Sequence, residues 1–427
     1  MTIQTSQKWN EVKFEDVCDF QNGYSFKNKN YVKAGNDTYE VFRMGNIERG
    51  GGFKFDKKPV YVKKSSVPIQ YILKEGDILM SMTDMKSSMA LLGHTALMPY
   101  SDRFVLNQRV GKIVIKRTDL LDLNFFYYYS NSPEYISQLR STAHSGVQVN
   151  LSTKDIKELP INLPPLSIQK KIGSIISSYD QLINNNAIRI RILEDIAKKI
   201  YIEWFINFRF PGYNKIKFNK DGLPDGWEKI ELNNCISIYR GKSYSSEDLI
   251  RNENSIPFVN LKCIKRFGGF RKDGLKSFSG MYKEFHKVSK GDIVMAMTDM
   301  TQERMIVARS ARIPSLGVDF GIVSMDLVKI EPKDNCEKDF LYAYFRWSDF
   351  SDNVKNHANG ANVLHLTPDR ITDYKFVCPP KYLQKKFSDF VRNLFDEIDS
   401  IELSNDSLGK IRDLLVPYLV SGEHELK

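Results

Sequence analysis

Apolar residues recur at helical spacing from Leu163 to Phe208, and no proline or second glycine follows Gly173 in this stretch. Written as heptads, the pattern has two seam rows. One takes Ile172, Tyr179, Asn186, Leu193 and Ile200, and the other takes Ile168, Ile175, Leu182, Arg189 and Ile196. At about 1.5 Å per residue such a helix would be on the order of 60 Å long, which exceeds the width of a small domain. The pattern therefore predicts a long helix that packs on a partner helix.

The same chain supplies a partner after its second double proline, Pro379-Pro380. In the stretch after this proline pair, the same heptad spacing places Phe387, Leu394, Ile401, Leu408 and Leu415 in the row that corresponds to the first seam row. We expect the two helices to pair as an antiparallel coiled coil, with ordinary helix core as the alternative. Pro417 falls in the last turns and predicts a kink or an early end. Asn186 predicts a polar layer that sets the register of the pair.

A globular segment precedes each helix, and the two segments share a plan. Trp227 corresponds to Trp9, and the run 290–300 matches the run 75–85 almost letter for letter. Turn residues and short alternating runs indicate β-rich segments with strands at 74–82 and 104–116 and a helix over 121–139. Ser152, with Asp155 three residues later, predicts the cap of a short helix.

The predicted fold class is α+β, with two β-rich domains that arose by internal repetition and stand in pseudo-twofold relation. The predicted domains are a first globular domain at 1–163, a central long helix at 164–210, a second globular domain at 211–378 and a C-terminal long helix at 379–427.

Composition narrows the class of protein only slightly. A net charge of +10 and a pI near 9.0 weakly favour a polyanionic partner. The five cysteines have no zinc-knuckle spacing, so we interpret them as reduced thiols and predict no metal site. No stretch resembles a membrane span or a signal peptide, and the expected location is the cytoplasm.

Several short motifs resemble catalytic, metal-binding or nucleotide-binding motifs but lack residues that those sites require. Gly241-Lys242-Ser243 ends like a phosphate-binding loop, yet Ile236 stands where its first glycine belongs. His144 and His357 are at equivalent places, but no second metal ligand recurs beside both. Thr83-Asp84 and its repeat at 298–299 either cap a loop or face a ligand. We predict no catalytic residue, because no cofactor loop, amine-methylation motif or carboxylate constellation is present.

Two segments that each end in a polar loop, a short helix, a proline pair and a long Gln-Lys-Lys helix resemble the specificity (S) subunit of type I restriction-modification enzymes. The resemblance covers the whole chain and is strongest at 150–172 and 365–387. The family usually has a glutamate before this glutamine, and Ile168 and Leu383 stand there instead. The role of that glutamate is not transferred.

The resemblance implies a non-catalytic subunit whose two target-recognition domains read a bipartite DNA target across a gap set by the helices. It implies three kinds of partner: double-stranded DNA, two modification (methyltransferase) subunits and ATP-driven restriction subunits. It also implies that S-adenosylmethionine and ATP with magnesium bind those partner subunits and that this chain has no cofactor. Because the halves differ around a shared Met-Thr-Asp run, we hypothesise two non-identical half-sites.

Candidate DNA-facing residues are polar, lie in predicted loops and occupy equivalent regions of the two halves. In the first half they are Arg43, Lys54, Thr83, Asp84, Lys86, Gln108, Arg109, Ser145 and Gln148. In the second half they are Lys262, Arg266, Arg271, Thr298, Gln302, Arg304, Asn359 and Asn362.

Other readings remain open at this point. The chain could be a protein-binding scaffold with two modules on a helical rod, a solitary nuclease or methyltransferase, or a specificity protein of a related system. Binding to duplex DNA that weakens steeply with salt separates the first from the DNA-reading role.

Overall fold

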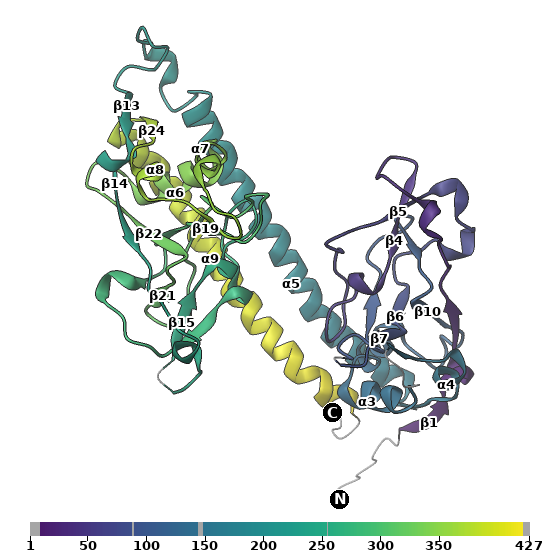
Figure 1. Cartoon of the computed structure of the whole chain (residues 1–427). Coiled ribbons are helices and arrows are strands. Elements are labelled where there is room, and N and C mark those ends of the chain that lie inside the picture. The colour runs from purple at the N-terminus through teal and green to yellow at the C-terminus, as the bar shows by residue number, and fades with distance from the viewer. Residues whose placement is uncertain (1–8, 88, 144–147, 254, 422–427) are drawn as a thin grey trace, which may run out of the picture. The chain divides into compact units, whose positions relative to one another are not determined.

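The structure, a computed structural model, describes residues 9–87, 89–143, 148–253 and 255–421 (Figure 1). The chain forms two compact units. Unit 1 comprises Met1–Asn184 with Asp406–Lys427, and unit 2 comprises Asn185–Asn405. Two long helices, α5 (Leu166–Tyr201) and α9 (Lys381–Val420), each contribute residues to both units. None of the described helices combines the length and apolarity that crossing a membrane requires.

Unit 1 is built on two four-stranded sheets. One has the order β2-β10-β6-β8, formed by Cys18–Asn22, Val110–Ile115, Ile78–Ser81 and Thr95–Leu97. The other has the order β3-β5-β4-β9, formed by Tyr31–Val32, Tyr61–Lys63, Thr38–Phe42 and Phe104–Leu106. Two short pairs complete it: β1 (Asn10–Lys13) with β12 (Pro160–Leu163), and β7 (Thr83–Met85) with β11 (Gln148–Asn150). The short helices are α1 (Phe14–Val17), α2 (Leu123–Tyr129), α3 (Pro133–Ser141) and α4 (Thr153–Glu158).

Unit 2 repeats this plan. Its first sheet, β14-β22-β18-β20, is formed by Ile236–Arg240, Leu327–Pro332, Ile293–Ala296 and Ser310–Arg312. Its second, β16-β15-β21-β17, is formed by Lys276–Phe278, Ile256–Val259, Gly321–Val323 and Lys287–Val288. The short pairs are β13 (Glu228–Glu231) with β24 (Lys375–Cys378), and β19 (Thr298–Asp299) with β23 (Leu364–His365). The short helices are α6 (Lys338–Trp347), α7 (Phe350–Val354) and α8 (Asp369–Thr372). The predicted α+β class with an internal repeat is confirmed.

The central strands are buried on both faces. In β18, Ile293 and Met295 pack with the helices, whereas Val294 and Ala296 pack against the second sheet. Successive side chains of a strand point to opposite faces, so one strand can serve two cores. The sequence predicted a turn and then a buried strand at 74–82, and β6 confirms the strand. Burial on both faces explains why Ile78, Leu79 and Met80 are consecutively apolar.

Two predicted elements are each divided in the structure. The strand expected at 104–116 is broken at residues 107–109 into β9 and β10, which belong to different sheets. The helix expected at 121–139 ends at Tyr129, and a new helix begins at Pro133 with Ser132 as its cap. Proline fits the first turn of a helix but not its interior, so Pro133 forces the break. The predicted Ser152 cap is present, because its hydroxyl accepts a bond from the amide of Asp155 at 3.1 Å.

In unit 1 the two long helices run antiparallel. Ile172 and Ile176 of α5 share a core with Leu419 and Val420 of α9. Further along α5, Asp180 accepts a 2.6 Å hydrogen bond from Arg412, which lies earlier in α9. As residue numbers rise along α5, those of its α9 contacts therefore fall.

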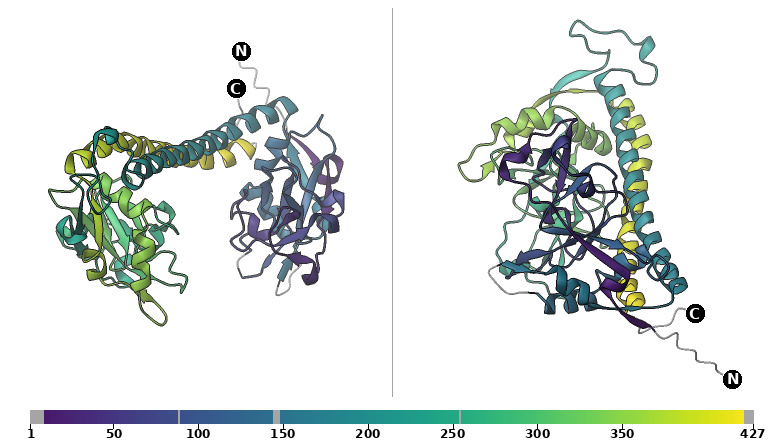
Figure 2. Two further views of the ribbon diagram at one scale, coloured as in Figure 1. Left: turned by 90° about the horizontal axis from the view of Figure 1, so that it is seen from above. Right: turned by 90° about the vertical axis from the view of Figure 1, so that its right-hand side faces the viewer.

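Unit 2 shows the same antiparallel sense. Asn186 of α5 contacts Asn405 of α9, and the ring centroid of Tyr201 lies 6.2 Å from that of Phe387. The two helices lie side by side within each unit in all views (Figure 2). The predicted antiparallel coiled coil is confirmed.

The seam itself differs in part from the prediction. The row Ile172, Tyr179, Asn186, Leu193 and Ile200 is buried or half-buried, as is the row Phe387, Leu394, Ile401, Leu408 and Leu415. The second row of α5 was placed one residue too early, because Leu182 and Ile196 are exposed. The true second row of α5 is the buried or half-buried series Ile176, Ile183, Ile190 and Ala197. This series contains no charged residue, whereas the series chosen from the sequence contained Arg189.

Pro417 does not end α9, which continues to Val420. The prediction was a kink or an early end, and the helix ends three residues after the proline. Only three helical residues follow Pro417, so the helix continues for less than one turn beyond the residue that lacks a backbone N–H. The amide of Ser421 bonds to the carbonyl of Pro417 at 3.2 Å.

Candidate nucleic-acid interface

Each unit contains one Met-Thr-Asp run, and in both it forms the edge of a two-stranded ladder. In unit 1, Thr83 pairs with Asn150, and Met85 pairs with Gln148. In unit 2, Thr298 pairs with His365. The polar loops that follow the helical segments at 123–141 and 338–357 are therefore bonded directly to these runs.

The aspartate of each run holds a loop rather than facing outward. The carboxylate of Asp84 accepts bonds from the amides of Met85 at 2.7 Å and Leu91 at 2.6 Å. Asp299 is fully buried and accepts bonds from the amides of Thr301, Ile306 and Val307. Asp84, which we had placed among the DNA-facing candidates, instead fits the capping alternative. Asp84 is also buried, so its carboxylate serves the loop and is not presented to a base.

The backbone donors also set the charge state of Asp299. Burial alone would raise its pKa, but the hydrogen bonds from Ile306, Thr301 and Val307 together outweigh burial and lower the pKa below its ordinary value. The side chain therefore remains a carboxylate at neutral pH, and the loop over residues 300–307 stays tied to a fixed charge.

The threonines point toward a neighbouring loop. The hydroxyl of half-buried Thr83 lies 2.9 Å from the sulfur of Met44. The hydroxyl of buried Thr298 donates to a carboxylate oxygen of Asp326 at 3.3 Å. Contacts within the protein therefore already fix the side chains of both threonines.

The loop beside the threonine is built the same way in both units. The amide of Met82 bonds to the carbonyl of Arg109 at 3.1 Å, and the amide of Met297 bonds to the carbonyl of Asp326 at 2.8 Å. The glycine that lies against this loop has no room for a side chain, since a Cβ on Gly23 or Gly241 would lie 2.0 Å from a loop carbonyl oxygen. Asn107-Gln108-Arg109 of unit 1 thus corresponds to Ser324-Met325-Asp326 of unit 2.

Three predicted residues of unit 1 meet around one surface pocket of about 490 Å³. They are Arg43, Gln108 and Arg109, and the pocket is also lined by Phe26, Asn28, Tyr31, Met44, Gly45, Asp56 and Asn107. Gln108 and Arg109 are exposed. Arg43 already forms an ion pair within the chain, because its guanidinium lies 2.7 Å from the carboxylate of Asp56.

The predicted cations divide into two kinds. Lys54 lies 3.1 Å from Glu48, and Arg271 lies 2.7 Å from Asp273, so both are ion-paired within the chain. Among the predicted cations, Lys86, Arg109, Lys262 and Arg266 are exposed and make no ion pair with any other described residue. A phosphate does not have to displace a carboxylate from these four, which makes them the better phosphate ligands.

In unit 2, two loops are held against each other. Gln302 donates to the carbonyl of Ala361 at 3.0 Å, and Arg304 donates to the carbonyl of Ala358 at 3.3 Å. Asn359, bridged to His365, and Asn362 are exposed in the second loop. The structure therefore brings Gln302, Arg304, Asn359 and Asn362 together beside the Thr298 ladder. In unit 1, Gln148 is half-buried on the equivalent ladder, and Ser145 lies outside the described residues.

Sequence reasoning missed several residues at the same loops. Met85 and Met300 directly follow the two aspartates and are exposed, and Met325 is exposed where unit 1 has Gln108. Lys242 forms a bridge with Ser324, as Tyr24 does with Asn107. The signal was available for Lys242 and Tyr24, because each directly follows the glycine already matched between the repeats.

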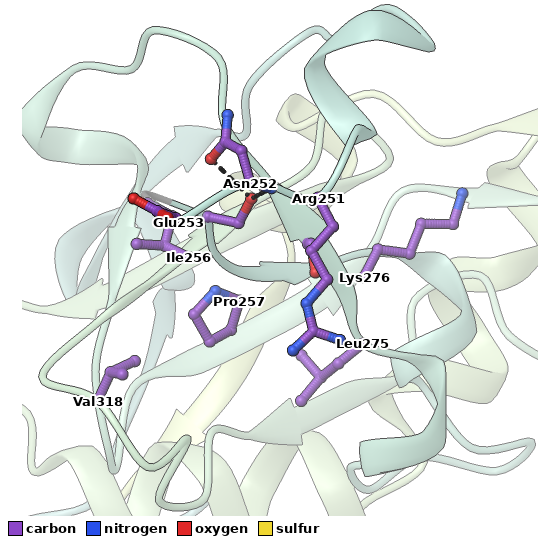
Figure 3. Close-up of a pocket in the computed structure, with 10 residues that line it drawn as sticks. Arg251, Asn252, Glu253, Ile256, Pro257, Leu275, Lys276 and Val318 are labelled. Carbon is purple, nitrogen blue, oxygen red and sulfur yellow. Dashed lines mark hydrogen bonds between the residues drawn. The ribbon is translucent and has the colours of Figure 1, made fainter.

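A surface pocket of about 810 Å³ belongs to unit 2 and lies elsewhere (Figure 3). Arg251, Lys276 and Glu253 line it together with apolar Ile256 and Val318. It contains none of the residues predicted from the sequence. The pocket mixes both signs of charge, so it does not favour a polyanion. Within the described residues, the metal-ligating side chains that gather in a group of three are Cys235, Cys336 and Cys378.

Comparison with known proteins supports the repeat independently. The family profile described as "Type I restriction modification DNA specificity domain" matches residues 6–194 and again residues 224–408. The chain is 25% identical over 362 residues to the MjaIX specificity subunit of Methanocaldococcus jannaschii, covering 82% of this chain and 78% of that one. It is 23% identical to the HindI specificity subunit of Haemophilus influenzae, covering 82% and 87%.

Among solved structures, the S subunit of a type I restriction-modification system from M. genitalium has a similar fold. The TM-score is 0.57 at 18% sequence identity, and the match covers 98% of both chains. At this identity the match concerns the fold.

Proposed function

The chain belongs to the type I restriction modification DNA specificity family, and we propose that its two units each read one half of a bipartite DNA target. As a specificity subunit it is non-catalytic. The proposal rests on one observation: two units of the same design place different side chains at the same exposed loop. Sequence is read where side chains reach base edges, while the shared framework fixes where they stand.

The loop at 107–109 and its counterpart at 324–326 carry the main difference between the units. Unit 1 offers Gln108 and Arg109, an amide and a guanidinium that suit adenine and guanine edges. Unit 2 offers Met325 and Asp326, an apolar side chain and a hydrogen-bond acceptor. Such different chemistry on one framework supports two non-identical half-sites.

The free cations support the DNA-binding part of the proposal. Lys86 and Arg109 in unit 1, and Lys262 and Arg266 in unit 2, are exposed and without an ion pair among the described residues. Unpaired cations on the surface of each unit can hold phosphates and set the register. A protein-binding scaffold does not require this arrangement.

The remaining activities belong to partner subunits. Under this proposal the chain docks two modification subunits that use S-adenosylmethionine, and restriction subunits that use ATP and magnesium join the complex. This chain then supplies the target choice and acts in the cytoplasm.

The test is a methylation map of DNA from cells that express the chain with its cognate modification subunit. We expect modified adenines in one split motif with a fixed unspecified gap and two different halves. Replacing residues 1–163 with the corresponding domain of a relative should change only one half. A perfectly palindromic motif would contradict non-identical halves, and the absence of any split motif while the subunits copurify would contradict the reading role.

A sharper version substitutes the loop alone. Gln108→Ala with Arg109→Ala should relax or change one half of the motif, whereas Met325→Ala should affect the other half. Lys54→Ala, which removes a cation paired with Glu48, is the matched control and should leave the motif intact. If both loop variants changed the same half, the assignment of one half to each unit would be wrong.

A further inference from the structure

Unit 2 contains a cluster of three thiols in its core. Cys235 precedes β14, Cys336 precedes α6, and Cys378 ends β24 just before α9. Their Sγ atoms all lie within 4.8 Å of one another, and the three residues are 0%, 6% and 9% exposed. They are far apart in the sequence, so no spacing motif reveals them. The fold alone brings them together.

The internal repeat identifies the equivalent residues of unit 1. The carbonyl of Cys235 accepts a bond from the amide of Lys333, as the carbonyl of Val17 accepts one from Lys116. Val17 therefore occupies the place of Cys235.

The other two positions follow in the same way. The amide that follows Cys336 bonds to the side chain of Gln384, and the amide that follows Leu121 bonds to the side chain of Gln169. Cys378 and Leu163 both end the strand that pairs with the first strand of their unit.

Unit 1 thus fills this place with Val17, Leu121 and Leu163, which share one apolar core. Aliphatic packing is sufficient for the fold, as unit 1 demonstrates. Unit 2 replaces all three contacting side chains by cysteine. A single buried cysteine packs as a small apolar residue, but three sulfurs within 4.8 Å of one another also form a set of soft metal ligands.

Polar donors surround the thiols. The side-chain amide of Asn335 donates to Sγ of Cys235 at 3.7 Å, and the side-chain amide of Gln384 donates to Sγ of Cys378 at 3.5 Å. Amide donors to ligand sulfurs are the usual second layer around a thiolate-bound metal.

We propose that Cys235, Cys336 and Cys378 bind one thiophilic divalent cation, with Zn²⁺ as the natural choice. With zinc–sulfur bonds of about 2.3 Å, the sulfurs of a tetrahedral site stand about 3.8 Å apart. The thiols need only small rotations to reach that spacing. The ion takes the place of the protons that remain on the thiols, which are released to solvent.

The fourth ligand has a candidate in the neighbouring strand. Glu228 of β13 stands directly opposite Cys378 in the ladder, and residues opposite one another point to the same face. The equivalent residue of unit 1 is Asn10, opposite Leu163. A carboxylate oxygen is an acceptable fourth zinc ligand.

A metal here would bind the start of β14, the segment before α6 and the end of β24 to one another. It would therefore act as a structural link within unit 2 and have no counterpart in unit 1. This departs from the sequence-based expectation that the chain carries no metal, and it is independent of which DNA sequence the unit reads.

The experiment is a titration of the reduced, metal-free full-length chain with Cd²⁺, followed by ultraviolet absorption of the sulfur-to-cadmium charge transfer. We expect one saturable equivalent with an intensity that corresponds to three thiolates, and a higher melting temperature of the loaded chain. The absorption counts thiolates without any substitution, so it remains decisive if a variant fails to fold. Saturation without thiolate absorption, or no stoichiometric binding, would overturn the proposal.

The matched variant gives unit 2 the residues of unit 1: Cys235→Val, Cys336→Leu and Cys378→Leu together. It should fold, lose the bound equivalent and show no shift of melting temperature with Cd²⁺. The control is Cys263→Ala, which removes a buried thiol of unit 2 outside the cluster and should retain the bound equivalent. Undiminished Cd²⁺ binding by the triple variant would assign the metal to another site and refute the cluster.

Discussion

The side-chain amide of Asn186 donates a 2.8 Å hydrogen bond to the side-chain oxygen of Asn405 across the two long helices of unit 2. From the sequence, Asn186 was predicted to form a polar layer in an otherwise apolar seam. The structure gives it a polar partner in the same layer. A single paired polar layer in an otherwise apolar seam costs stability but disfavours other registers, because any shift leaves both amides unpaired.

Replacing both asparagines should therefore test whether the pair lowers the free energy of unfolding while it favours one register. We expect Asn186→Leu with Asn405→Leu to stabilise the chain by about 1 kcal/mol, because no buried polar group is left. The single change Asn186→Leu should destabilise it by about 1–2 kcal/mol, since Asn405 then lacks its partner. Urea denaturation measures both. A double variant that is less stable than the single one would show that this asparagine pair does not lower the free energy of unfolding.

Charge placed on the seam should disrupt the helix pair. Leu193 and Leu408 are half-buried seam residues of α5 and α9, and we expect Leu193→Asp or Leu408→Asp to cost about 2–3 kcal/mol, since each puts a carboxylate between apolar side chains. We further expect these variants to uncouple the two recognition domains, so that limited proteolysis cuts the helices. Leu414→Asp is the control, because that side chain is 74% exposed. A protected helix pair in both seam variants would argue against this role.

The long helices show what a sequence pattern can and cannot reveal. The row from Ile172 to Ile200 was predicted correctly because heptad spacing determines which residues share a face. The second row was placed one residue too early, since Ile175 and Ile176 are both apolar and only the partner helix decides between them. The partner of Asn186 could not be predicted either, because the repeat aligns it with Ile401, whereas antiparallel packing places it beside Asn405.

The candidate interface was predictable in outline for a different reason. The repeat located the Met-Thr-Asp runs and their neighbouring loops, because similar sequence in two places implies a shared framework. It could not separate a loop anchor such as Asp84 from an exposed side chain such as Arg109. That distinction depends on which backbone amides turn toward a carboxylate, and only the folded loop determines it.

The buried carboxylate of Asp299 should make stability depend on pH in acid. Its pKa is lowered in the folded state, so its contribution to the free energy of unfolding is present above the unfolded-state pKa of about 3.9. That contribution is lost as the pH falls through the lower folded-state pKa. We expect Asp299→Asn to cost about 2–3 kcal/mol at pH 7, with a difference from the unaltered chain that shrinks below about pH 4.

Urea denaturation from pH 3 to pH 7 tests this dependence. The control Asp273→Asn changes an exposed carboxylate and should show a small difference at every pH. A difference for Asp299→Asn that grew on acidification would reverse the sign argued here. It would show that the folded loop favours the protonated side chain.

Salt dependence should distinguish phosphate contacts from base contacts. Lys86 and Arg109 are exposed and unpaired among the described residues, so Lys86→Ala and Arg109→Ala should each reduce the slope of log affinity against log salt by about 1 if they neutralise a phosphate. The measurement is binding of the complex with its modification subunits to target DNA between about 50 and 200 mM salt. Lys410→Ala removes an exposed cation from α9 and should leave the slope unchanged.

If Arg109 instead reads a base, Arg109→Ala should keep the slope and lose discrimination at one position of one half-site by about 1–3 kcal/mol. If neither the slope nor the discrimination changed, Arg109 would lie outside the interface, and the loop at 107–109 would no longer explain the difference between the two units.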